Sequence, residues 1–220
     1  MIFAHKRHLI GVGDGCGGRT CRFAGSRPKT YAVCSAITDQ RYPGTVMKVS
    51  LLQVNTVVGD LAGNAGRIAA GAREAARDRP DVIVAPELSL TGCPLRDLLL
   101  RPGFAARALS VLDGLSASLA GAPPVIIGLP IANPAGTGRP AFNAAALIRE
   151  GEVAEIFRKP SISPGVLDED RYFEPAGGEI PFIRFGGKTL GVVIGETICC
   201  EGPMPDVIVN PVASPFAAGR

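Results

Sequence analysis

The chain has 220 residues, of which 46% are hydrophobic and 20% charged, enough for one large or two small domains with a buried core. No apolar run approaches the roughly 18 residues that a membrane-spanning helix needs, so we expect no membrane segment. The net charge of +3 comes from residues 1–46, which carry seven Lys/Arg and two Asp. The body, residues 47–220, is nearly neutral, which argues against a nucleic-acid-binding face.

Residues 1–46 show no sustained period of 2 or 3.6 and are interpreted as a disordered leader or as an over-extended start before Met47. Their Arg-bearing, acid-poor composition is also compatible with a targeting peptide. Gly13, Gly15 and Gly18 fit G-x-G-x-x-G, but without a preceding strand or a following helix they predict no dinucleotide site. The absence of a long apolar signal region favours a cytoplasmic protein with reduced thiols.

From Met47 onward, apolar periodicity predicts a regular order of strands and helices. The predicted elements are a strand at 47–55, a helix capped by Asp60 and stopped by Pro80, a strand at 81–87, a helix opened by Pro102, a strand at 124–130, two strands within 141–159, a hairpin within 181–196 and a strand at 206–212. Strands alternating with helices and then hairpins predict an α/β layer fold.

Polar residues at strand ends are the first candidates for a site, because ligands in α/β sheets bind beyond the carboxyl ends of strands. Glu87 ends a buried apolar strand, where a lone charge is costly unless it is paired or solvated. It is either a site residue or a helix-capping, water-facing glutamate. Lys159 ends another strand and is either a surface charge or, beside Glu87, a stabiliser of a developing oxyanion.

Other reactive residue types give weaker signals. Cys199 and Cys200 are adjacent but lack a second Cys or His pair, so no zinc site is predicted. The only histidines, His5 and His8, lie in the leader, so a Cys-His or Ser-His-Asp mechanism has no imidazole in the body. Any nucleophile in the body would therefore need a carboxylate as its base.

Four stretches carry a resemblance to a known family: LLQVNTVVGDLAGNAGRI (51–68), DVIVAPELSLTGCPLRDLLLRPGF (81–104), FNAAALIREGEVAEIFRKP (142–160) and LDEDRYFEPAG (167–177). Over about residues 47–216 the body resembles the carbon-nitrogen hydrolase (nitrilase-type) superfamily. Within it, the chain looks most like the N-terminal glutaminase domain of glutamine-dependent NAD⁺ synthetases.

This resemblance implies an α-β-β-α sandwich that hydrolyses an amide with a Glu-Lys-Cys set. Matched by motif, Glu87 takes the position of the general base and Lys159 that of the lysine that stabilises the tetrahedral intermediate. Glu169 matches the second acidic residue, which orients the site. Cys93, where the family usually has a tyrosine, and Ser214 fall at substrate-binding positions.

The resemblance also implies the ligands and partners. The substrate would be glutamine or another small amide, and its ammonia would pass to a separate synthetase domain. ATP and a deamido-NAD substrate belong to that other domain, so no cofactor or metal is expected here. A homo-oligomer or a synthetase domain is the implied protein partner, with no role for nucleic acid or membrane.

The sequence departs from the family where the nucleophile should be. Gly195 stands at the cysteine position of the strand-end motif, and only about ten residues separate it from the next strand. The chain also ends soon after Ser214, so the sandwich is expected to be incomplete at its C-terminus. We therefore expect an amide hydrolase domain with impaired or absent catalysis. The alternative is a non-catalytic remnant or protein-interaction module with the same fold.

Overall fold

The computed structural model describes residues 31–36, 47–162, 167–178, 181–185, 187–195 and 205–213. Its elements are β1 (Tyr31–Ala36), β2 (Val49–Val54), α1 (Leu61–Ala76), β3 (Val82–Val84), the 3-10 helix η1 (Arg96–Leu100), α2 (Phe104–Ser118), β4 (Val125–Ala132), β5 (Ala141–Arg149), β6 (Glu152–Arg158), the single-turn α3 (Glu169–Tyr172), β7 (Phe182–Phe185), β8 (Lys188–Val192) and β9 (Val207–Val209).

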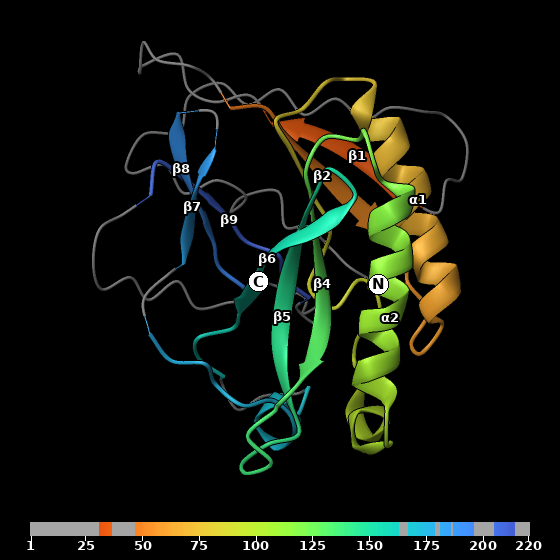
Figure 1. Ribbon diagram of the computed structural model, residues 1–220, viewed down its shortest axis with the longest axis vertical. Helices are drawn as coiled ribbons and strands as arrows, with labels where there is room; N and C mark the ends of the chain where they lie inside the picture. Colours follow the sequence, from red (N-terminus) through yellow and green to blue (C-terminus); the bar gives the residue numbers. More distant parts are fainter. Residues whose placement is uncertain are drawn as a thin grey trace, which may run out of the picture.

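Two β-sheets form the frame of the part of the chain that the structure describes. The larger has six strands in the order β1 to β6, with β2, β3 and β4 parallel to one another and the remaining neighbours antiparallel. The smaller has the order β7-β8-β9, with β7 antiparallel and β9 parallel to β8. Helices α1 and α2 lie on one side of the large sheet and β7 to β9 on the other (Figure 1). The described residues therefore supply three layers, helix, sheet and sheet.

Each interface between layers has its own apolar core. Side chains such as Ile68 of α1, Leu112 of α2 and Ile127 of β4 fill the space between the helices and the large sheet. Between the two sheets, Phe157 of β6 packs with Leu190 of β8 and their neighbours. The large sheet is thus buried on both faces, which explains the continuous apolar runs of its central strands.

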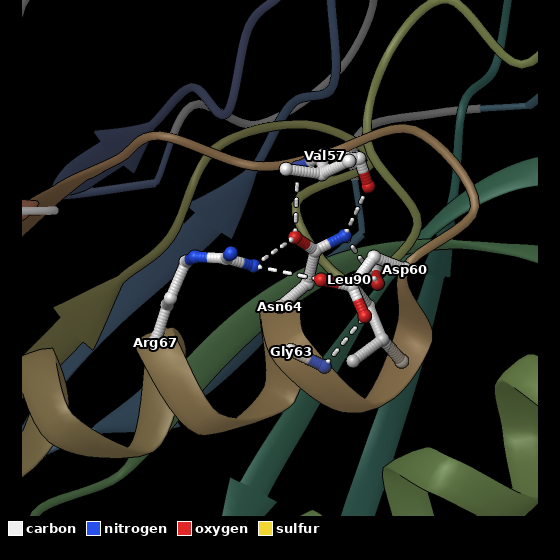
Figure 2. A network of polar contacts seen from close by, with 6 residues as sticks. All are labelled: Val57, Asp60, Gly63, Asn64, Arg67 and Leu90. Atoms are coloured by element: carbon white, nitrogen blue, oxygen red, sulfur yellow. Dashed lines mark hydrogen bonds and ion pairs between the residues drawn. The ribbon is translucent and has the colours of Figure 1, made fainter.

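Helix α1 is tied at its start to two loops by one buried amide (Figure 2). Asp60 caps the helix by accepting a hydrogen bond from the Gly63 N–H at 2.9 Å, as predicted. The side chain of Asn64, fully buried, donates to the carbonyls of Val57 at 2.8 Å and Leu90 at 3.2 Å and accepts from the Val57 N–H at 2.9 Å. These bonds fix the loops after β2 and β3 against α1.

The predicted strands and long helices from Met47 onward are confirmed, with ends that differ by a few residues. Strand β1 is a difference, because it falls in the segment without periodicity and pairs with β2 through backbone hydrogen bonds. The rest of residues 1–46, with the glycine motif and both histidines, lies outside the described residues. Within the part that the structure describes, we find no helix with the length and apolar character to cross a membrane.

Candidate active site

Glu87 reaches the site because the chain after β3 crosses closely over β4. The crossing is at Gly128, where a Cβ atom would lie only 2.4 Å from the Leu88 nitrogen and 2.5 Å from the Pro86 oxygen. The Leu90 N–H donates to the Gly128 carbonyl at 3.0 Å, which secures the contact. Leu88 adopts a positive φ of 52°, an uncommon backbone conformation for a residue with a side chain. Glu87 is thereby carried past β4 toward β5.

Lys159 and Asn143 come from the next two strands. Lys159 directly follows β6, and its backbone N–H donates to the Asn143 carbonyl in β5 at 2.8 Å. Both side chains are buried, and Lys159 is only 7% exposed. The β5–β6 hairpin therefore places an ammonium and a carboxamide side by side, both within hydrogen-bonding distance of Glu87.

Four side chains form one hydrogen-bonded group, which we call the Glu-Asn-Lys-Glu cluster: Glu87, Asn143, Lys159 and Glu169. The Lys159 Nζ lies 3.0 Å from Oε1 of Glu87 and 2.6 Å from Oε2 of Glu169, the first residue of α3. The Asn143 Nδ2 lies 2.7 Å from Oε1 of Glu87 and 3.1 Å from Oε1 of Glu169. The second Glu87 oxygen accepts a hydrogen bond from the Ala213 N–H at 2.8 Å.

Burial and mutual attraction set the protonation of the cluster. Burial raises the pKa of Glu87 above its ordinary value; Lys159 opposes this rise and Glu169 adds to it. Burial alone would lower the pKa of Lys159, but the two carboxylates outweigh it and raise that pKa. Lys159 therefore stays a cation, suited to bind a developing oxyanion, and Glu87 is a stronger base than an exposed glutamate.

Gly195 lies beside the Lys159 side chain. It is buried just beyond β8, and its N–H donates to the Pro211 carbonyl at 3.0 Å. A Cβ atom built on Gly195 would lie 2.4 Å from Cε and 2.6 Å from Nζ of Lys159. The residue has no nucleophilic atom, and the place where a side chain would start is filled by Lys159.

Cys93 lies in the turn after the Glu87 loop and is half-buried. Burial, together with the charges of Glu87 and Glu169, raises the pKa of its thiol to about 12. The thiol is therefore protonated at neutral pH and is not a nucleophile. Ser214, Cys199 and Cys200 lie outside the described residues. Among the residues that are described, no group of three or more His, Cys, Asp or Glu is arranged to hold a metal ion.

Sequence reasoning singled out Glu87, Lys159 and Glu169, which the structure brings together, but it did not single out Asn143 or the Ala213 N–H. The sequence does contain a signal for Asn143, because this residue is the one amide in the otherwise apolar run AFNAAALI of residues 141–148. A buried amide in such a strand needs partners, so it marks a polar site. Ala213 contributes only a backbone group, which no side-chain pattern reveals.

Comparison with known proteins gives the family of the chain. The sequence profile of the carbon-nitrogen hydrolase family matches residues 48–214, most of the chain. The chain belongs to the carbon-nitrogen hydrolase family. The glutamine-dependent NAD(+) synthetase of Xylella fastidiosa is 34% identical over 186 residues, covering 79% of this chain and 33% of the relative. This carbon-nitrogen hydrolase chain thus spans about a third of the length of the curated relatives it matches.

Solved structures show the same fold. The glutamine-dependent NAD(+) synthetase from Cytophaga hutchinsonii matches with a TM-score of 0.65 and 22% identity, over 79% of this chain and 32% of that one. An amidase from Nesterenkonia sp., solved after acrylamide had added to its active-site cysteine, matches with a TM-score of 0.56 and 22% identity, over 67% of this chain and 57% of that one. The mixed α/β fold of this carbon-nitrogen hydrolase domain is therefore of the nitrilase type.

Proposed function

We propose that this carbon-nitrogen hydrolase domain recognises the carboxamide of glutamine or another small amide, as a glutaminase domain of the NAD⁺ synthetase type would, but does not hydrolyse it at a useful rate. One observation carries the proposal. The cluster around Glu87 and Lys159 is assembled and buried, while the neighbouring strand-end position is Gly195. The base and the cation are present beside a position without a nucleophile.

The chemistry follows from these side chains. An amide carbonyl would accept a hydrogen bond from the Lys159 ammonium, and Glu87 would take a proton from an attacking group. Glycine supplies no thiol for that attack, and removing the nucleophile from a comparable hydrolase lowers the rate on the order of 10⁶-fold. Without that thiol we expect no ammonia release above the uncatalysed background. No cofactor is proposed for this domain.

A second candidate is a non-catalytic remnant or interaction module with the same fold. It is favoured by the position of the Lys159 side chain, which fills the space next to Gly195 and binds both carboxylates. In that arrangement the cluster is a structural link between β3, β6 and α3, and no amide is bound.

Calorimetric titration of the purified chain with glutamine separates the two candidates. Amide recognition predicts saturable binding of glutamine, little binding of glutamate, and loss of binding in Glu87→Ala. Glu152→Ala serves as the matched control, because Glu152 is an exposed glutamate of β6 outside the cluster. Absence of glutamine binding by the folded parent chain would overturn amide recognition and favour the interaction module.

A further inference from the structure

The side chain of Asn143 bridges the carboxylates of Glu87 and Glu169, which within the described part of the chain are otherwise joined through Lys159. Its amide nitrogen has two hydrogens, and the two nearest acceptors are Glu87 at 2.7 Å and Glu169 at 3.1 Å. Hydrogen bonds to an ionised acceptor are roughly twice as strong as those between neutral groups. Asn143 is fully buried, so water does not compete for these bonds.

The orientation of this amide is fixed by the carboxylates. The nitrogen of Asn143 faces an oxygen of Glu87 and an oxygen of Glu169, both of which can accept its hydrogens. Its Oδ1 is left without a hydrogen-bond partner within the described part of the chain. A buried acceptor without a partner is unfavourable, and the two bonds on the nitrogen side offset this cost. The amide is thus held by the carboxylates rather than by general packing.

Asn143 also holds Lys159 in place, through its backbone. Its carbonyl accepts the Lys159 N–H at 2.8 Å, so the residue that aligns both carboxylates also holds the start of the lysine side chain. Because the amide is neutral, it draws the two carboxylates together without cancelling the negative charge that Lys159 needs as a partner. Within the cluster, Asn143 is the neutral residue that bonds both carboxylates.

We infer that Asn143 is a positioning residue, whose side-chain amide aligns Glu87 and Glu169 on the Lys159 ammonium in the arrangement that an amide substrate would meet. The benefit of this role to the protein depends on the proposed amide recognition. Its experimental test does not. The alignment can be measured on the cluster itself, whether or not glutamine binds.

The test compares Asn143→Leu, of similar size without hydrogen bonds, with Asn143→Asp, of similar shape without the donor. Leu147→Ala is the matched control, because Leu147 is buried in the same strand but packs in the core between the sheets. Carbon-13 NMR of the chain with labelled glutamate residues follows the titration of Glu87. The Glu87 signal is assigned as the one that disappears in Glu87→Gln. Calorimetry gives the affinity for glutamine.

We expect Asn143→Leu to titrate Glu87 at a higher pH than the parent, since the ionised form of Glu87 loses a donor. Asn143→Asp should raise it further, since it adds a third carboxyl group to the cluster. Glutamine affinity should fall about tenfold in Asn143→Leu, the effect of one lost bond to a charged group. Leu147→Ala should lower thermal stability and leave both readouts unchanged. If Asn143→Leu does not fold, Asn143→Ser, smaller and still a donor, should give an intermediate shift.

An unchanged Glu87 titration in folded Asn143→Leu would overturn the inference, because this variant removes the donor without adding a charge. If the parent fails to bind glutamine while the Glu87 titration still moves in the variants, the proposed function falls and the positioning role of Asn143 stands. The proposed function and the positioning role of Asn143 can therefore be disproved independently of each other.

Discussion

The backbone at Gly195 has a φ of +91°, and the place where its side chain would begin contains Cε and Nζ of Lys159. Restoring a nucleophile by Gly195→Cys would therefore require the end of the Lys159 side chain, which binds both carboxylates, or the backbone to shift. We expect the variant to release no ammonia from glutamine and to melt at a lower temperature than the parent. An ammonia assay and thermal unfolding measure the two effects.

Gly187→Cys is the control for this variant. Gly187 has a comparable φ of +80°, but nothing lies within 4 Å of a Cβ built there. Both variants place a side chain in the left-handed region, and only Gly195→Cys meets Lys159. Recovered glutaminase activity in Gly195→Cys, or equal melting temperatures for the two variants, would show that the lysine does not obstruct the position.

Cys93 offers a second test at the scale of single residues. With its pKa raised from 9.0 to about 12, its thiolate fraction at pH 8 is about a thousandth of that of an ordinary thiol. Alkylation by iodoacetamide should therefore be slow in the native chain and fast in the unfolded one, with the rate rising about tenfold per pH unit. Peptide mapping that follows the alkylated fraction of the Cys93 peptide over time measures this rate. Rapid native labelling at pH 7 would contradict the burial of the thiol.

At the scale of elements, the close crossing at Gly128 holds the Glu87 loop on β4. A methyl group there would meet backbone atoms of Pro86 and Leu88, which cannot rotate away. We expect Gly128→Ala to lower the free energy of unfolding by about 1–3 kcal/mol, as over-packing does, and to weaken any glutamine binding. Urea unfolding of the variant and the parent measures this loss.

The matched control is Gly114→Ala on α2, where a Cβ would meet nothing within 4 Å. A glycine in a helix interior costs about 0.5–1 kcal/mol relative to alanine, so this variant should be more stable than the parent. If the two alanine variants changed stability in the same direction, the crossing at Gly128 would not be as tight as the structure indicates.

Some of these elements could be predicted from the sequence alone, and others could not. Strands such as β4 and helices such as α1 were predictable, because long apolar periods and caps like Asp60 are local signals. Strand β1 and the short η1 and α3 were not, since they depend on neighbours rather than on their own pattern. The site was predictable where residues end strands, as Glu87 and Lys159 do. Asn143 lies within a strand, and its role follows only from register.

At the scale of the whole molecule, the cluster lies where the two sheets meet. Glu87, Asn143 and Lys159 come from the large sheet and its loops, whereas the Ala213 N–H follows β9 of the small sheet. Gly195 follows β8 of the same small sheet and reaches the Lys159 side chain. The packing of one sheet on the other therefore completes the hydrogen bonds of Glu87 and sets which residue faces Lys159.

We propose that this carbon-nitrogen hydrolase domain keeps Glu87 and Lys159 as the base and the cation of an amide-hydrolysing site without its nucleophile. Ammonia release from glutamine by the purified chain, measured beside Glu87→Ala, tests it most directly. We predict release at the uncatalysed background in the parent and no further decrease in the variant. Release above background that is abolished in Glu87→Ala would show that this chain hydrolyses glutamine.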